Sequence, residues 1–161
     1  MKIAILSDTH NNWTNFQKAL EWIEKEKIQL VLHCGDVTSQ EIIDDAKKLF
    51  EKAASAEALA SQIRFVGGNG DYNLDLPEKM ELEIDGKKIA FTHFPKIARE
   101  LIKSGKFNLV FHGHTHKAWE EKINETRMIN PGELAGQFYK PTFATYDTET
   151  DKLELKILER L

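Results

Sequence analysis

Residues 2–10 of the chain read KIAILSDTH, in which a short apolar run stops at Asp8. A run of this length without polar alternation is typical of a strand that is buried on both faces of a sheet. Residues 28–34, IQLVLHC, repeat the pattern, and Asp36 follows them. Two buried strands joined by a helix form a βαβ unit with parallel strands and a right-handed crossover. This stretch therefore predicts an α/β fold.

The residues after each of these strands predict helices. Asn11 or Asn12 can cap the first helix, and Thr38 with Glu41 has the spacing of a capping box for the next. An Ala-rich stretch then predicts two helices up to about Gln62. The apolar side chains of the first helix recur at helical spacing and predict a core face: Trp13, Phe16, Leu20 and Ile23.

The rest of the chain is predicted to be rich in strands, at residues 63–67, 80–85, 87–92, 107–112, 118–123, 126–130, 142–147 and 152–158. An Asp-Gly pair at residues 85–86 predicts a β-hairpin. Residues 95–104 predict a helix that stops at Gly105, and residues 130–132, Asn-Pro-Gly, fit a type II turn. Helical crossovers followed by hairpins indicate two packed sheets with helices on the outer faces.

Composition narrows the class of protein. The 161 residues suit one domain, residues 1–161, and 41% hydrophobic with 30% charged residues is ordinary for a soluble protein. A net charge of −4 does not favour binding to long nucleic acids, which needs a basic surface. The single cysteine, Cys34, fits a reducing compartment. No apolar run is long enough for a signal peptide or membrane span, so we expect a cytoplasmic protein.

Polar side chains that can bind metal ions follow five of the predicted strands, at the point where each strand ends. They are Asp8, His10, Asp36, Asn69, His93, His114 and His116. In open α/β sheets, ligands collect beyond the carboxyl ends of the strands, so we expect these side chains to meet. Taken singly, each histidine is better explained as a surface or hydrogen-bonded residue. Imidazole, carboxylate and amide groups together suit Mn, Fe, Zn, Ni or Co better than a thiolate-dependent site does.

Seven such residues suit two ions that share a bridging ligand, and Asp36 is the natural bridge because a carboxylate has two oxygens. Two divalent ions, two aspartates and a bridging hydroxide sum to a charge of about +1, which attracts an anion such as a phosphodiester. The bridging hydroxide is the expected nucleophile, because metal ions lower the pKa of bound water. We place Asp36, Asn69 and His10 closest to the chemistry. Mn²⁺ is the first choice of ion, with Ni, Zn, Fe, Co and Mg as alternatives.

In order along the chain these residues form the motifs Asp8-x-His10, Gly35-Asp36, Gly68-Asn69-x-Asp71, His93 and Gly113-His114-x-His116. The set resembles the calcineurin-like metallophosphoesterase superfamily, and within it the small bacterial and archaeal phosphodiesterases and the retromer subunit of vacuolar sorting. The resemblance covers essentially the whole chain. It implies a four-layer αββα sandwich of two mixed β-sheets flanked by helices. It also implies one metal site from Asp8, His10, Asp36 and His116, and a second from Asp36, Asn69, His93 and His114.

The sequence departs from that family at two positions. Many larger relatives have a histidine after the metal-binding asparagine, where this chain has Gly70, although Asp71, which would support that histidine, is present. Without an acid there, diesters with acidic leaving groups are favoured. Phe94 stands where relatives often have glycine, and it either narrows the site or simply packs. Only one short helix and one strand separate His93 from Gly113, so we expect an open site for a small phosphate ester.

Several residues and functions carry a second interpretation. His33 and His112 are expected to make hydrogen bonds rather than to bind metal. A non-catalytic scaffold on the same fold, suggested by Gly70, and a phosphomonoesterase or nucleotidase are the alternative functions. Four aromatic residues are candidates for a surface between copies of the chain, with ordinary packing as the default: Phe94, Trp119, Phe138 and Tyr139.

Overall fold

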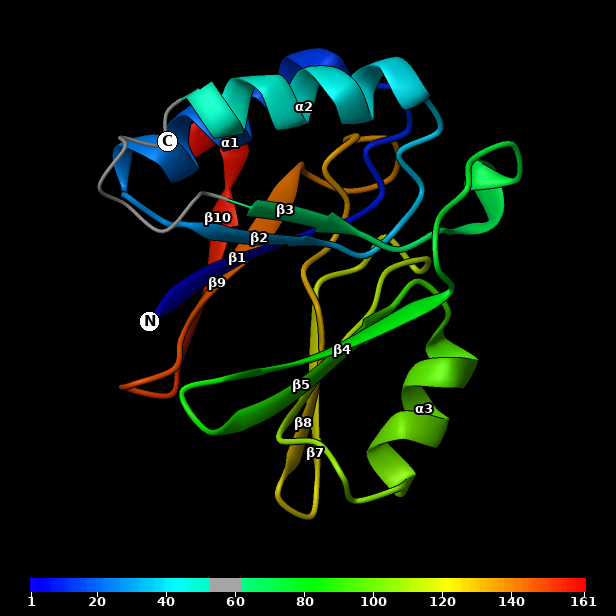
Figure 1. The fold of residues 1–161 in the computed structure, drawn as a ribbon, viewed down its shortest axis with the longest axis vertical. Helices are drawn as coiled ribbons and strands as arrows, with labels where there is room; N and C mark the ends of the chain where they lie inside the picture. The colour runs from blue at the N-terminus through cyan, green and yellow to red at the C-terminus, as the bar shows by residue number, and fades with distance from the viewer. Residues whose placement is uncertain (53–61) are drawn as a thin grey trace.

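The computed structural model describes residues 1–52 and 62–161, which form two five-stranded mixed sheets (Figure 1). The first sheet has the order β10-β9-β1-β2-β3, with bounds Lys152–Ile157, Thr142–Asp147, Lys2–Leu6, Leu30–His33 and Gln62–Phe65. The second has the order β4-β5-β6-β8-β7, with bounds Lys79–Ile84, Lys87–Thr92, Leu109–Phe111, Thr126–Asn130 and Trp119–Ile123.

The helices cover the outer faces of the two sheets. Figure 1 shows α1 (Trp13–Lys25) and α2 (Gln40–Lys52) over the first sheet and α3 (Pro95–Lys103) beside the second. Two short 3₁₀ helices, η1 (Asn69–Asp71) and η2 (Leu158–Arg160), complete the described elements. The four-layer sandwich expected from the sequence is confirmed. Within residues 1–52 and 62–161, none of the helices has both the length and the apolar character needed to cross a membrane.

The alternation of side chains along β1 explains its continuous apolar sequence. Ile3 and Ile5 pack between the two sheets, whereas Ala4 and Leu6 pack beneath α1 and α2, and all four are fully buried. Strand β5 repeats the arrangement on the other sheet. A strand buried on both faces has no position for a polar side chain until it leaves the core, which is where Asp8 stands.

Helix α1 forms as its sequence predicts. Asn12 caps it, because its side-chain Oδ1 accepts a hydrogen bond from the Asn15 N–H at 3.1 Å. Phe16, Leu20 and Ile23 are buried against the first sheet. The helix therefore holds the chain that leaves β1 in a fixed position relative to that sheet.

The start of α2 corrects one prediction. Thr38 does not cap the helix, since its φ is +70° and its N–H donates to Asp71 Oδ1 at 2.7 Å. Ser39 Oγ accepts from the Ile42 N–H instead, at 3.4 Å. The predicted helical stretch also ended too late: Gln62 already lies in β3, and residues 53–61 lie outside the described residues.

The predicted hairpin and turn in the second half of the chain are confirmed. Strands β4 and β5 pair antiparallel with Ile84 opposite Lys87, so the Asp-Gly pair forms a two-residue turn. Gly132 has a φ of +83°, as the third position of a type II turn requires. Strands β3 and β6 are shorter than predicted, because residues 66–68 and 112–113 leave the sheets to form the site.

Strand direction decides where the polar side chains gather. Strands β1, β2 and β3 run parallel in the first sheet, and β5, β6 and β8 run parallel in the second. Within each sheet the carboxyl ends of these strands therefore share one edge.

Candidate metal centre

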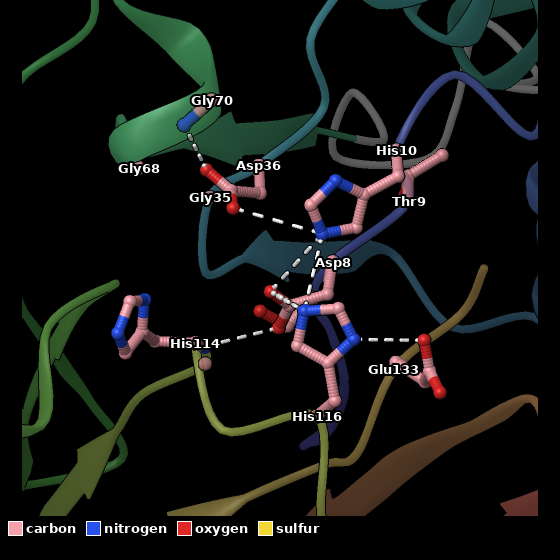
Figure 2. A network of polar contacts seen from close by, with 12 residues as sticks. Asp8, Thr9, His10, Gly35, Asp36, Gly68, Gly70, His114, His116 and Glu133 are labelled. Carbon is pink, nitrogen blue, oxygen red and sulfur yellow. Dashed lines mark hydrogen bonds and ion pairs between the residues drawn. The ribbon is translucent and has the colours of Figure 1, made fainter. Parts of the chain in front are cut away.

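All seven residues predicted as ligands lie close together at the carboxyl ends of the parallel strands. The first sheet contributes the residues that follow β1, β2 and β3, and the second those that follow β5 and β6. Potential ligand atoms of Asp8, His10 and His116 lie within 4.8 Å of one another, and so do those of Asp8, Asp36 and His93. Figure 2 shows His10, Asp8 and His116 converging on one point, with Asp36 alongside.

The first cluster consists of Asp8, His10 and His116. The two histidine Nε2 atoms are 3.2 Å apart. Asp8 Oδ1 lies 3.7 Å from Nε2 of His10 and 3.3 Å from Nε2 of His116. This oxygen is buried and receives no hydrogen bond from the described residues. A buried carboxylate oxygen without a donor is costly unless a cation balances it.

The second cluster consists of Asn69, His93 and His114. His93 Nε2 lies 3.2 Å from His114 Nδ1 and 3.1 Å from Asn69 Oδ1, and the last two atoms are 2.9 Å apart. His93 Nδ1 donates to the carbonyl oxygen of Cys34 at 2.9 Å. The lone pair of His93 therefore sits on Nε2 and faces the other two residues.

Asp36 lies between the two clusters. Its Oδ2 is 3.6 Å from His10 Nε2 and 3.5 Å from His93 Nε2. Its Oδ1 accepts a hydrogen bond from the Gly70 N–H at 2.7 Å (Figure 2). That bond fixes the carboxylate so that one oxygen faces both clusters.

The donor set fits divalent cations. Imidazole nitrogens, carboxylate oxygens and an amide oxygen point at two neighbouring positions, where they would otherwise repel one another. The orphaned Asp8 Oδ1 supplies an independent sign of fit. The chemistry of the donors thus fits a divalent metal centre.

The electrostatics of the first cluster favour opposite charges on its members. Burial by itself would raise the pKa of Asp8, but its contacts with His10 and Ser7 outweigh burial and lower that pKa. The contact with Asp8 raises the pKa of His10 against the opposing effect of burial.

Backbone strain concentrates at the site. Five of the seven predicted ligands have positive φ: Asp8 (+54°), His10 (+43°), Asp36 (+57°), His114 (+71°) and His116 (+61°). A left-handed conformation costs roughly 1–2 kcal/mol for a residue with a side chain. Strained residues of this kind cluster at functional sites, where the surrounding structure holds them in place.

Gly113 allows the two sheets to approach at the site. A Cβ at this position would lie 1.9 Å from Ser7 Oγ and 2.7 Å from Asp8 Oδ2. The glycine lets the His114 N–H reach Asp8 Oδ2 at 3.1 Å (Figure 2). This contact links a loop of the second sheet to the first ligand of the first sheet.

Sequence reasoning missed Glu133. Its side chain is fully buried, and its Oε2 accepts from His116 Nδ1 at 2.8 Å, which leaves Nε2 of His116 with its lone pair toward the cluster (Figure 2). A carboxylate behind a ligating histidine fixes the tautomer and ring orientation. The signal was present, since Glu133 follows β8, which runs parallel to β6. It was hidden because an acidic residue after a Pro-Gly turn normally belongs to the solvated surface.

Asp71 acts as a structural hydrogen-bond acceptor in the absence of a histidine at position 70. Its carboxylate accepts from the N–H groups of Asp36 and Thr38, both at 2.7 Å, and of Gly68 at 2.9 Å. It thereby ties the loop after β2 to the loop after β3. Three backbone N–H groups already occupy the carboxylate, so its place in the structure does not depend on a neighbouring histidine.

His33 and His112 make hydrogen bonds, as predicted. His33 is fully buried, donates from Nε2 to Thr9 Oγ1 at 2.8 Å and accepts at Nδ1 from the Gly35 N–H at 3.3 Å. Burial lowers its pKa to about 4. His112 Nδ1 donates to the carbonyl oxygen of Gly113 at 3.0 Å, and burial lowers its pKa as well. Neutral His33 braces the loops that carry Asp8 and Asp36.

The four aromatic candidates fall into two groups. Phe94 is half-buried, with its ring edge-on to His93 at 5.2 Å between centroids and 6.1 Å from His114. The other three, Trp119, Phe138 and Tyr139, are exposed. Contact between copies of the chain stays a prediction.

Comparison with known proteins identifies the family. The calcineurin-like phosphoesterase superfamily domain matches residues 1–151. A phosphodiesterase of Methanocaldococcus jannaschii is 32% identical over 176 residues, which cover 99% of this chain and all 100% of the relative. A solved archaeal phosphodiesterase has a TM-score of 0.82 at 30% identity and covers 98% of this chain and 99% of its own. Vps29 from Entamoeba histolytica, solved with Zn²⁺, shares the fold at a TM-score of 0.71 and 19% identity, over 96% of this chain and 90% of its own. Motifs, fold and relatives agree that the chain belongs to the calcineurin-like phosphoesterase superfamily.

Proposed function

We propose that the protein is a phosphodiesterase that holds two divalent metal ions on seven side chains and cleaves small phosphodiesters. The observation that carries the proposal is the position of Asp36 Oδ2, 3.6 Å from His10 Nε2 and 3.5 Å from His93 Nε2. One carboxylate oxygen lies beside both clusters, as a shared ligand must. Asp8, His10 and His116 would complete one site, and Asn69, His93 and His114 the other.

Relatives support the diester as substrate. The Methanocaldococcus jannaschii protein and the solved archaeal protein are both phosphodiesterases, at 32% and 30% identity over nearly the whole chain. The donor set of nitrogen and oxygen atoms without thiolate supports Mn²⁺ as the ion, and Ni, Zn, Fe, Co and Mg are the alternatives to be tested beside it.

Divalent ions at this site would lower the pKa of a water molecule and offset the negative charge of the phosphate. The chain supplies the arrangement. The Gly70 N–H fixes the Asp36 carboxylate, and Glu133 sets the tautomer of His116. His10 must be neutral to bind an ion, so we expect metal binding to compete with the protonation that Asp8 favours at His10.

The absence of a side chain at Gly70 supports a preference for one kind of leaving group. A Cβ at this position would lie 2.9 Å from Thr38 Cγ2 and 3.2 Å from Asp36 Oδ1, so a side chain here would crowd both residues. No imidazole can donate a proton from this position to the departing oxygen. Diesters whose leaving group is acidic, such as a phenol, are therefore the expected substrates.

Hydrolysis of bis(p-nitrophenyl) phosphate with added Mn²⁺, Ni²⁺, Zn²⁺ or Mg²⁺ tests the proposal, because its leaving group needs little protonation. We expect metal-dependent turnover that Asp36→Asn lowers by more than about a hundred-fold, the upper range for residues that merely support a metal ligand. The matched control is Asp45→Asn, whose carboxylate lies on the surface of α2.

The other outcomes point to the alternative functions. Folded, metal-loaded protein that turns over no ester would favour the non-catalytic scaffold. A strong preference for p-nitrophenyl phosphate over the diester would make the protein a phosphomonoesterase.

A further inference from the structure

The loop that follows β8 is held in place by the same carboxylate that orients His116. Glu133 is fully buried, and it accepts hydrogen bonds from the N–H groups of Gln137 at 2.9 Å and Phe138 at 2.6 Å. The Tyr139 N–H donates to it as well. Three consecutive amides bound to one buried carboxylate fix the backbone on both sides of Phe138. The backbone that carries Phe138 is thus fixed before any ligand arrives.

Phe138 stands at the rim of the metal centre. Its ring meets that of His116 edge-on, with 5.1 Å between centroids and an angle of 75°. His116 in turn stacks on His10 at 4.9 Å. The side chain of Phe138 is nevertheless 75% exposed. Its ring borders the first cluster and keeps most of its surface toward solvent.

Folding alone explains this placement poorly. Isolated exposed apolar residues are common and need no explanation. Here, however, the backbone is fixed by a buried charge and the ring touches a predicted metal ligand. An aromatic ring on a fixed backbone binds a flat partner at low entropic cost, since only its two side-chain torsions remain to be restricted.

The proposed chemistry of the site indicates which flat group would contact Phe138. A phosphodiester carries two organic groups, and its phosphate would sit at the ions beside His116. An organic group attached to that phosphate would therefore extend over the rim of the site. Phe138 offers an exposed apolar ring there, next to the first cluster. Aromatic side chains stack on nucleobases and aryl rings alike, because each has a π face.

We propose that Phe138 is a specificity-determining residue that stacks on a flat aromatic group of the phosphodiester. The inference rests on the proposed function of the same site. It adds the chemical class of the substrate: a diester with at least one aryl or nucleoside group, rather than a purely alkyl diester.

Binding of non-hydrolysable phosphonates tests this without relying on turnover. Calorimetry would measure the affinity of the Mn²⁺-loaded protein for phenylphosphonate and for methylphosphonate. We expect phenylphosphonate to bind about ten-fold more tightly, a ratio typical of one aromatic stacking contact. Phe138→Ala should reduce that ratio to near one while methylphosphonate binds as before. Phe138→Trp should keep the ratio, and Phe138→Leu should lose most of it.

Tyr139→Ala is the matched control, because it removes an exposed aromatic side chain from the same loop but leaves its backbone N–H in place. It should leave the ratio unchanged. Adenosine 5′-monophosphate distinguishes the two sources of the aromatic group. Loss of its affinity in Phe138→Ala indicates a nucleobase, whereas loss confined to phenylphosphonate indicates an aryl ester.

The failure of this inference differs from the failure of the proposed function. If both phosphonates bind the unmodified protein equally, or if Phe138→Ala keeps the ratio, Phe138 does not select the substrate, and the phosphodiesterase proposal stands. If neither phosphonate binds metal-loaded protein, the proposed function fails and the role of Phe138 fails with it.

Discussion

At the scale of the residue, the Glu133 carboxylate both orients His116 and holds the loop after β8. Its hydrogen bond with His116 leaves Nε2 of that histidine free for an ion, and its bonds with three backbone N–H groups fix the loop after β8. Those amide contacts lower the pKa of Glu133 although burial acts to raise it. A negative charge is therefore stable in this buried position and is available to the histidine.

Glu133→Gln should weaken Mn²⁺ binding by about ten- to a hundred-fold, the usual cost of losing the partner behind a ligating histidine. The physical reason is that an amide has one acceptor oxygen where the carboxylate has two. Calorimetric titration with Mn²⁺ measures the change, and Glu149→Gln on the exposed surface is the matched control. Unaltered affinity in Glu133→Gln would show that His116 needs no carboxylate behind it.

Gly70 yields a second residue-scale prediction, because its neighbours block the histidine found in larger relatives. Gly70→His should lose activity, since its Cβ would collide with Thr38 Cγ2 at 2.9 Å. Thr38→Ser removes that methyl group and keeps the backbone N–H that Asp71 holds. Thr38→Ser combined with Gly70→His should therefore be more active than Gly70→His alone, most clearly on a diester with an alkyl leaving group. Steady-state rates on methyl and aryl diesters would compare Gly70→His, Thr38→Ser and the double variant. Equal rates for the two variants that carry the histidine would refute the steric explanation.

At the scale of the element, strand ends decide where chemistry occurs, and this is what the sequence predicts best. Residues 3–6, for example, are apolar and buried on both faces of the sheet, so the polar residues that follow them mark the end of the strand. The carboxyl ends of parallel strands then bring these residues together. The gathering of the seven side chains could be anticipated this way, and the two oxygens of a carboxylate suggested Asp36 as the bridge. The assignment of the other six residues to two sites came only from family resemblance.

The sequence could not predict features that depend on contacts between distant loops. Thr38 has the residue type and spacing of a cap, but the Asp71 carboxylate holds its N–H and forces φ to +70°. Glu133 looks like a surface residue until His116 is placed beside it. In both cases a contact between a buried carboxylate and a distant segment overrides the local preference. The sequence around Thr38 or Glu133 does not reveal that distant partner.

The hairpin between β4 and β5 provides an element-scale test. Gly86 has a φ of +74°, and a Cβ there would meet nothing within 4 Å. Gly86→Ala should therefore destabilise the protein by about 1 kcal/mol through backbone conformation alone, as measured by urea denaturation. Gly86→Asn should cost less, because asparagine tolerates the left-handed region. Metal affinity should not change in either variant, since the turn is remote from the site, and a change would mean that the hairpin is coupled to the metal centre.

At the scale of the whole molecule, the candidate metal centre lies across the two sheets. Asp8, His10, Asp36 and Asn69 follow strands of the first sheet, and His93, His114 and His116 follow strands of the second. Ions bound by both groups would tie the sheets together at this edge. Metal binding and global stability should therefore be linked.

This linkage predicts a pH-dependent stabilisation by Mn²⁺. Because the pKa of His10 is raised above 6.5 without an ion, its contribution to the stability of metal-free protein is full below about pH 6.5. That contribution fades as the pH rises through the raised pKa, while the neutral imidazole becomes available to the ion. Mn²⁺ at about a hundred times its Kd should raise Tm by about 5–10 °C at pH 8. The same Mn²⁺ concentration should raise Tm by less at pH 6, where protonated His10 weakens metal binding.

Differential scanning calorimetry at the two pH values measures both increments. The difference between them should shrink in His10→Gln, which cannot bind the competing proton. An increment that is independent of pH in the unmodified protein would mean that the ion does not displace a proton from His10.

The most direct test of the central claim is anomalous X-ray diffraction from crystals grown with Mn²⁺. The account predicts two manganese peaks on either side of Asp36 Oδ2, one bound by Asp8, His10 and His116 and the other by Asn69, His93 and His114. A single peak, or two peaks that do not share Asp36, would contradict it.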